Sequence, residues 1–344
     1  MGVISSTVGR GSFVTAQAPD VPMSRHSTQG TALPWSTILS KRLDAPALAR
    51  FDRLSRSQVG SDTINLQRMQ PSPDLLPVEP LRRCLEHVLR TTEARALGYA
   101  PRDGAEPLRE QIAEMLGREG VPTRPEDVVI TSGAQQALDL VARALIDPGD
   151  PVMIEALSYS GAINMFAAHG ATLVPVATDA EGPDLAHLAR AGSRGAKLFY
   201  VIPNGHNPTS STMSAARRED LVAWSRRAGV PLLEDDFGAD LDLDGDVMPL
   251  PLRALDADVI HVGTFSKRLI PALRVGYVVC PAPLRPALLT VKHAADLGGS
   301  LLLQLTLAEF LERGYLRGHL RRVIPEYRSR RDALEEALTK HVPA

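Results

Sequence analysis

Between residue 63 and about residue 315 the sequence alternates short apolar runs with segments of helical periodicity. Each run is short enough for one buried strand, and the segments between them are long enough for crossover helices. This pattern predicts an α/β fold with a mostly parallel central sheet and helices on both faces. The clearest runs are residues 128–131, 151–154, 171–176, 198–202, 231–233, 259–262 and 276–279.

The composition agrees with a globular chain of this class. Of the 344 residues, 44% are apolar and 23% are charged, and the formal net charge of −2 gives no overall nucleic-acid footprint. The two cysteines, Cys84 and Cys280, are far apart, so we expect neither a disulfide framework nor a zinc site. No apolar stretch approaches about 18 residues, and the N-terminus lacks a signal-peptide pattern. We therefore expect a cytoplasmic protein without a membrane span.

Four zones divide the chain. Residues 1–15 predict a short β-hairpin with a turn at Gly9–Gly11, and a short helix is expected near Trp35–Lys41. Pro325 should kink or break the last predicted helix. The zones are the hairpin at 1–15, a Pro-, Ser-, Gln- and Arg-rich linker at 16–62, a large domain at 63–315 and a helical segment at 316–344.

A lysine follows one of the apolar runs at the point where ligands bind in open α/β sheets, beyond the carboxyl ends of the strands. Lys267 ends the segment Gly263–Lys267, directly after the run 259–262. Its amine could form a Schiff base with a cofactor aldehyde. The side chains of Thr264, Ser266 and Arg274 could hold a phosphate on the same cofactor.

A helix start follows the run 128–131 and suggests a second phosphate contact. Small residues let the backbone approach an anion, and the first N–H groups of a helix are free to bind it. Ala134 and Gln135 would form the floor of this cup. An ordinary tight turn between strand and helix would leave the same sequence signal.

Two further residues follow apolar runs and could contact an aromatic cofactor ring. Tyr159, after the run 151–154, could stack on a pyridine ring, although it could equally be a rim or core tyrosine. Asn207 is held extended by the following proline, so its amide could donate to a phenolic oxygen; a simple Asn-Pro turn is the alternative. His206 could act as a base, but Lys267 already supplies that chemistry.

Three consecutive acids, Glu234 to Asp236, directly follow the run 231–233. Buried carboxylates are costly unless a cation faces them, and a protonated pyridine nitrogen would serve. Asp235 paired with that nitrogen would keep the ring cationic and make it an electron sink. A divalent metal is the alternative, but no Walker-type loop accompanies the acids. As a set, the residues predict a protein that binds pyridoxal 5'-phosphate (PLP).

The ordered set resembles the fold-type I PLP-dependent aminotransferases of class I/II over roughly residues 63–344. The resemblance implies that Lys267 carries PLP as an internal aldimine, that Asp235 pairs with the pyridine nitrogen and that Asn207 bonds the ring 3-oxygen. It further implies that Tyr159 stacks on the ring. The implied phosphate ligands are Ala134, Gln135, Ser266 and Arg274. The motifs that carry the likeness are Tyr99 with Gly104, Leu108 and Arg109, then Ser-Gly-Ala-Gln, Tyr-Ser-Gly, Asn-Pro-Thr, Glu-Asp-Asp and Ser-Lys with the following arginine.

The same resemblance implies the partners and the reaction. Tyr99 would reach the phosphate of a neighbouring subunit, which implies a homodimer with shared sites. Lys267 would move a proton between the α-carbon of an amino acid and the cofactor. The amino group would pass from that amino acid to a 2-oxo acid in two half-reactions.

A narrower resemblance is to MocR-type GntR transcriptional regulators. Residues 8–14 are similar to the last wing hairpin of their winged helix-turn-helix, and a linker follows as in that family. Because the recognition helices are absent from the sequence, DNA binding is expected only if a complete winged helix-turn-helix were present. This leaves two alternatives to an enzyme, a PLP-sensing effector domain without catalytic turnover and an inactive remnant.

Two departures from the aminotransferase pattern bear on activity. Phe237 stands where the family usually has a tyrosine that donates to the ring 3-oxygen, so Asn207 would be the main donor. The chain ends at Ala344, about where the family's small domain begins, and that domain carries the arginine that binds the substrate carboxylate. We therefore expect this clamp to be missing or supplied from elsewhere, and the sequence does not predict the amino-acid substrate.

Overall fold

The computed structural model describes residues 4–7, 11–14, 33–41, 48, 69–191, 195–238, 240–245 and 248–342. The chain divides into two compact units, Met1–Lys41 and Arg42–Ala344. In the first unit, β1 (Ile4–Thr7) pairs antiparallel with β2 (Gly11–Val14), which confirms the predicted hairpin. Helix α1 (Trp35–Ile38) confirms a short helix that ends before the expected Lys41. Most of the predicted linker lies outside the described residues.

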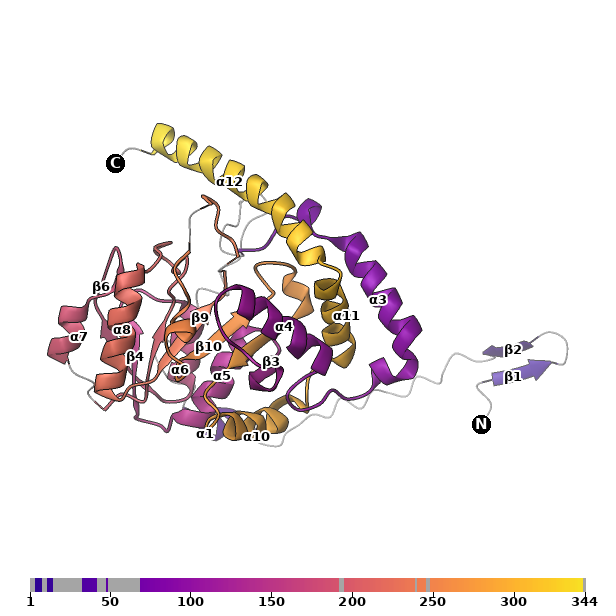
Figure 1. Cartoon of the computed structure of the whole chain (residues 1–344). Helices are drawn as coiled ribbons and strands as arrows, with labels where there is room; N and C mark the ends of the chain where they lie inside the picture. Colours follow the sequence, from indigo (N-terminus) through magenta and orange to yellow (C-terminus); the bar gives the residue numbers. More distant parts are fainter. Residues whose placement is uncertain are drawn as a thin grey trace. The chain divides into compact units, whose positions relative to one another are not determined.

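The second unit is built on a seven-stranded sheet in the order β3-β11-β10-β9-β8-β4-β5 (Figure 1). All seven predicted runs form strands of this sheet. Of the seven strands, β11 alone runs opposite to the other six and pairs antiparallel with β10 and β3, so the predicted mostly parallel sheet is confirmed. The strands are β3 (Val128–Thr131), β4 (Pro151–Glu155), β5 (Thr172–Val176), β8 (Leu198–Val201), β9 (Leu232–Asp236), β10 (Ile260–Thr264) and β11 (Gly276–Val279).

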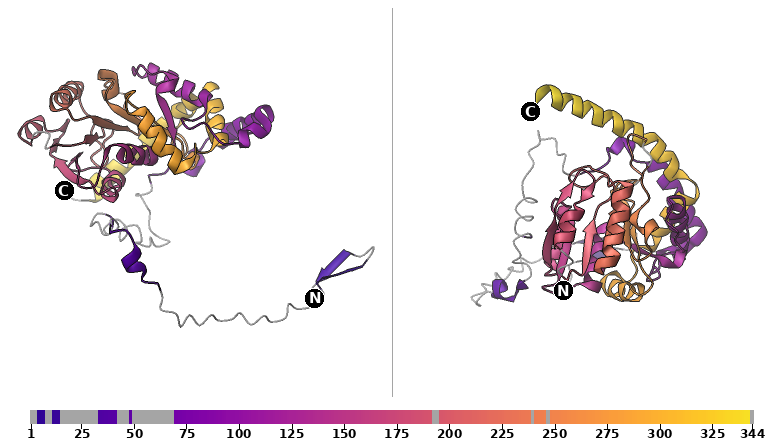
Figure 2. Two further views of the ribbon diagram at one scale, coloured as in Figure 1. Left: turned by 90° about the horizontal axis from the view of Figure 1, so that it is seen from below. Right: turned by 60° about the vertical axis from the view of Figure 1, so that its left-hand side comes forward.

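Helices cover both faces of this sheet, as Figures 1 and 2 show. Successive strand residues point to opposite faces, and both faces are apolar because both are buried. One face packs against α5 (Ala134–Leu145), α6 (Ser160–Ala168) and α10 (Arg285–Asp296). The other packs against α4 (Glu106–Arg118), α7 (Leu185–Ala191), α8 (Ala215–Ala228), α9 (Leu252–Leu255) and α11 (Leu301–Glu312).

Shorter elements connect these layers. Helix α3 (Val78–Thr92) packs beside α11, and the two-stranded pair β6 (Thr178–Asp179) and β7 (Gly182–Pro183) lies between β5 and α7 in the chain. The 3-10 turns are η3 (Pro73–Leu75), η4 (Glu93–Leu97), η5 (Pro125–Asp127) and η6 (Pro271–Leu273). Of the helices that the structure describes, none has both the length and the apolarity needed to cross a membrane.

The last helix corrects one expectation. Helix α12 (Tyr315–His341) continues through Pro325, so the predicted break is wrong. Proline removes only one backbone N–H, and the turns on either side of it keep their own hydrogen bonds. The first part of α12 is also held by packing, since Leu316, His319 and Val323 are buried.

Candidate active site

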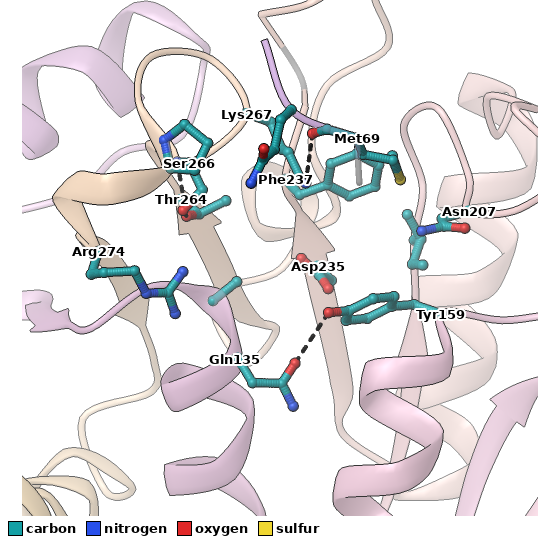
Figure 3. A pocket seen from close by; sticks show the side chains of 14 residues that line it. Met69, Gln135, Tyr159, Asn207, Asp235, Phe237, Thr264, Ser266, Lys267 and Arg274 are labelled. Atoms are coloured by element: carbon teal, nitrogen blue, oxygen red, sulfur yellow. Dashed lines mark hydrogen bonds between the residues drawn. The ribbon is translucent and has the colours of Figure 1, made fainter. Parts of the chain in front are cut away.

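A cavity of about 250 Å³ lies at the carboxyl ends of the central parallel strands. Nine of the ten predicted site residues line it, and Tyr99 is the exception. Figure 3 shows Arg274, Thr264 and Ser266 on one side of this cavity, Asn207 and Tyr159 on the other, and Asp235 between them. The lining residues are Met69, Gln70, Ala134, Gln135, Tyr159, Ile202, Asn207, Asp235, Phe237, Thr264, Ser266, Lys267, Pro271 and Arg274.

Lys267 presents its amine to the cavity just after β10. Its Nζ donates a hydrogen bond to the backbone carbonyl oxygen of Met69 at 3.1 Å. Met69 has a φ of 45°, in the left-handed region. Burial lowers the pKa of Lys267, and the charge of Arg274 lowers it further. A lowered pKa increases the share of neutral amine, which is the nucleophilic form. The environment therefore favours covalent chemistry at this nitrogen.

Asp235 is the buried acid of the site. Its Oδ2 accepts a hydrogen bond from the hydroxyl of Tyr200 at 2.7 Å, while its Oδ1 is buried and has no partner among the described residues. Burial raises the pKa of Asp235 to about 6; the hydrogen bond from Tyr200 opposes this, and the charge of Asp236 adds to it. A buried acceptor without a partner, on a residue that lines the cavity, fits a cationic ring nitrogen of a bound group.

A cup for an anion lies at the start of α5. Gly133 precedes this helix with φ of 89°, and a Cβ built on it would lie 3.0 Å from Nη2 of Arg274. The backbone N–H groups of Ala134 and Gln135 open the helix and have no intrahelical acceptor. Helix α5 has 12 residues, so its dipole also favours an anion at this end.

Hydroxyls and a guanidinium complete the cup from β10 and the loop after it. Thr264 Oγ1 donates to Ser266 Oγ at 3.1 Å, and the Ser266 N–H donates to Thr264 Oγ1 at 3.2 Å. Arg274 Nη2 donates to the carbonyl oxygen of Ser132 at 2.9 Å, which holds the guanidinium against the start of α5. This donor set suits a phosphate.

Tyr159 and Gln135 connect the floor and the wall of the cavity. The Tyr159 hydroxyl donates to Gln135 Oε1 at 3.3 Å. Burial raises the pKa of Tyr159, and the charge of Asp235 contributes to the same shift. The half-buried ring thus stays neutral and presents an aromatic surface to the cavity.

His206 lies next to Asn207 but does not line the cavity. Its Nε2 is 3.2 Å from the buried carboxylate of Glu155, and its Nδ1 is 2.8 Å from Thr209 Oγ1. These contacts tie the loop after β8 to the end of β4. His206 therefore helps to position Asn207, and its contacts do not direct it at a substrate.

The other two acids of the run point away from the cavity. Glu234 accepts hydrogen bonds from the N–H groups of Leu252 and Arg253, and its Oε2 is 2.9 Å from Nδ1 of His261. Asp236 accepts from Nδ2 of Asn204 at 3.0 Å. Within the described part of the chain, no group of three or more His, Cys, Asp or Glu side chains could hold a metal ion.

Some site residues were not predicted. Met69, Gln70, Ile202 and Pro271 line the cavity without any sequence signal of ligand binding. Tyr200, the partner of Asp235, lies inside the apolar run 198–202, and only the pairing of β8 with β9 in the structure brings it to the acid. Tyr99 is 84% exposed and bridges the backbone of Ser300, so its predicted contact with a neighbouring subunit stays a prediction.

The likeness to known proteins extends over nearly the whole second unit. Residues 72–343 match the family model for aminotransferases of class I and II. The chain belongs to the class I and II aminotransferase family. This confirms the predicted family and enzyme class. Enzymes of this family use PLP to move an amino group between amino acids and 2-oxo acids.

Three relatives illustrate the match. The chain is 37% identical to a 2-aminoadipate transaminase of Thermus thermophilus, over 79% of this chain and 68% of that protein. It is 31% identical to YdfD, an uncharacterised HTH-type transcriptional regulator of Bacillus subtilis, over 99% of this chain and 70% of that protein. The structure of the α-aminoadipate aminotransferase LysN of Thermus thermophilus, complexed with N-(5'-phosphopyridoxyl)-L-leucine, is 33% identical to it with a TM-score of 0.80, covering 90% of this chain and 78% of that chain. The predicted fold-type I architecture is confirmed.

Proposed function

We propose that the chain binds PLP through the amine of Lys267 and transfers an amino group between an amino acid and a 2-oxo acid. One observation supports this above the others. A single cavity joins a half-buried amine of lowered pKa to a buried carboxylate oxygen that has no partner among the described residues. An aldehyde on a protonated pyridine ring would satisfy both groups.

The other lining residues have roles that follow from their chemistry. Tyr159 would cover one face of the ring, and Asn207 would donate its amide to the phenolic oxygen, since Phe237 has no hydroxyl to offer. The phosphate would lie in the cup at the start of α5. Its ligands would be the N–H groups of Ala134 and Gln135 and the side chains of Thr264, Ser266 and Arg274.

Bound PLP supplies an electron sink for the negative charge that develops at the substrate α-carbon. Asp235 holds the proton on the ring nitrogen, which strengthens that sink. Lys267 Nζ takes the proton from the α-carbon and later delivers it, as a general base and acid. Burial and the charge of Arg274 lower the pKa of Lys267, which suits both directions of this transfer.

A homodimer with shared sites belongs to the same proposal. Tyr99 is free of the cavity of its own chain, and its side chain is almost fully exposed. Leu97 and Leu297 are exposed apolar residues in the segments that meet at the bridge between Tyr99 and Ser300. We propose that a second copy covers this surface and receives Tyr99 at its phosphate cup.

A second candidate is a PLP-sensing effector domain of a MocR-type regulator that binds the cofactor without turnover. The specific support is the extent of the match to YdfD. An alignment over 99% of the chain has to include most of the first unit with its hairpin. The match to the 2-aminoadipate transaminase covers 79% of the chain.

The visible absorbance of the purified chain with PLP tests the proposal. We expect a PLP band that is lost in Lys267→Ala and kept in Lys197→Ala, a control at a lysine paired with Asp150 away from the cavity. A panel of amino acids should then remove the band and release a 2-oxo acid. A stable band that no amino acid changes would favour the sensor, and no band in the parent chain would refute PLP binding.

A further inference from the structure

The carboxylate of Asp235 is held asymmetrically. Oδ2 accepts the hydrogen bond from the hydroxyl of Tyr200 at 2.7 Å, and Oδ1 has no partner within the described residues. One oxygen is therefore fixed, while the other remains available to a ligand in the cavity that Asp235 lines. A carboxylate with both oxygens free could rotate, because the terminal torsion of aspartate is soft.

Strand register places Tyr200 to make this contact. Tyr200 on β8 pairs with Leu233 on β9, and Asp235 lies two residues further along the same face of the sheet. The phenol is long enough to reach diagonally to the carboxylate of the neighbouring strand. Tyr200 and Leu233 both belong to the core that packs on α5 and α6.

Packing leaves Tyr200 with little freedom to make another contact. Its side chain is fully buried, and the ring of Phe166 packs edge-on against it with a centroid distance of 5.9 Å. The hydroxyl thus points to Asp235 before any ligand arrives. Such a preset donor favours the ionised carboxylate, because a hydrogen bond to the charged form stabilises it.

The surroundings of Asp235 make this donor important. The acid has to stay ionised to hold a proton on a ring nitrogen, yet it lies in the buried end of β9 next to another acid, Asp236. Burial raises the pKa of Asp235 to about 6 even with the Tyr200 bond in place. The other titratable groups that act on Asp235 are Tyr159 and His261. Without the Tyr200 hydroxyl, more of Asp235 would be protonated near neutral pH.

We propose that Tyr200 is a positioning residue of the cofactor site: its hydroxyl holds one oxygen of Asp235 and directs the other to the pyridine nitrogen of PLP. This inference rests on the proposed function. Tyr200 would touch neither PLP nor the substrate and would act through Asp235 alone. It would set how strongly the chain binds PLP and whether the ring nitrogen carries a proton.

The test compares Tyr200→Phe with a matched control, Tyr277→Phe. Tyr277 is also a buried strand tyrosine, and its hydroxyl has no partner within the described residues. For Tyr200→Phe we expect PLP binding to weaken by roughly tenfold or more near neutral pH, which is the usual effect of losing one hydrogen bond to a charged group. NMR of PLP labelled at the ring nitrogen should show a shift toward the unprotonated form. Tyr277→Phe should leave both measurements unchanged.

A double-mutant cycle separates the positioning role from a general loss of stability. In the Asp235→Ala background, Tyr200→Phe should no longer change PLP binding, because no side-chain oxygen is left for the Tyr200 hydroxyl to hold. If the single Tyr200→Phe variant keeps both its PLP affinity and its ring-nitrogen signal, the inference about Tyr200 is overturned and the proposed function is not. Absence of a PLP band in the parent chain would overturn the proposed function and this inference with it.

Discussion

Asp235 gives the sharpest quantitative prediction, because the same residue should stabilise the PLP complex and destabilise the chain without PLP. In the chain without PLP, its buried Oδ1 has no partner among the described residues. Asp235→Asn keeps the shape of the side chain and still offers an oxygen to the Tyr200 hydroxyl, but it cannot ionise. We expect this variant to be more stable than the parent at high pH when PLP is absent.

The size of the effect follows from proton linkage. Burial raises the pKa of Asp235 from 3.8 to about 6, so the folded chain binds a proton more tightly than the unfolded chain does. The tighter proton binding stabilises the folded chain fully at pH values below the pKa of Asp235 in the unfolded chain. This stabilisation is lost as pH rises through the pKa of Asp235 in the folded chain. A shift of about 2 units corresponds to about 3 kcal/mol of free energy of unfolding. The difference between variant and parent should therefore grow by about 3 kcal/mol between about pH 4 and about pH 8.

Urea denaturation of both chains without PLP, at fixed protein concentration across this pH range, measures that difference. Asp220→Asn, at an exposed aspartate on α8, is the control and should give a nearly flat difference. Adding PLP should reverse the order, because the parent gains more stability from the ligand than Asp235→Asn does. A difference that does not change with pH would refute the argument from burial, and equal stabilisation by PLP would refute the pairing with the ring nitrogen.

Two further substitutions test the buried charge and the backbone packing near the site. Burial raises the pKa of Glu119 to about 7, and the charge of Arg268 opposes this rise. The stability that protonated Glu119 contributes is therefore lost as pH rises from about 4.5 through about 7. Glu119→Gln should flatten the fall of the melting temperature over that range, and an unchanged slope would contradict this. A Cβ on Gly263 would lie 2.2 Å from Cζ of Tyr277, so Gly263→Ala should cost about 1–3 kcal/mol of unfolding free energy in urea. The matched Gly117→Ala, where nothing lies within 4 Å of the new Cβ, should be neutral or stabilising, and equal effects at the two sites would refute the packing argument.

The strands and most of the site could be predicted because both follow from one pattern. Each apolar run became a strand, and most of the candidate residues lie shortly after a run or at the start of the next helix. In a parallel sheet the carboxyl ends of the strands meet at one edge, so residues far apart in the sequence converge there. Lys267, Asp235 and Asn207 line one cavity for this reason.

What could not be predicted depends on register and on tertiary packing. Tyr200 lies inside an apolar run, where a tyrosine has the same pattern as any core residue, and only the pairing of β8 with β9 shows that its hydroxyl meets Asp235. The carbonyl of Met69 reaches Lys267 from nearly 200 residues away in the chain, and a backbone oxygen leaves no mark in a sequence. Pro325 failed as a helix breaker because the helix before it is packed on the domain.

The three acids at the end of β9 explain why a cation is expected in the cavity. Side chains alternate across a strand, so the side chains of Glu234 and Asp236 lie on one face of the sheet and that of Asp235 lies on the other. On the shared face, Glu234 is paired with His261. Burial raises the pKa of Asp236, and the nearby charges of His261 and Arg268 oppose that rise.

Asp235 differs from both of these neighbours. Among the described residues its one hydrogen-bond partner is the neutral hydroxyl of Tyr200, and no ion pair is made by its carboxylate. A buried carboxylate that is left without a cation is costly, and natural sequences retain such costs mainly at functional sites. Because the described residues supply no cation to Asp235 on this face, the proposed ligand would bring one. The protonated ring nitrogen of PLP has the charge and the directionality that the free oxygen of Asp235 requires.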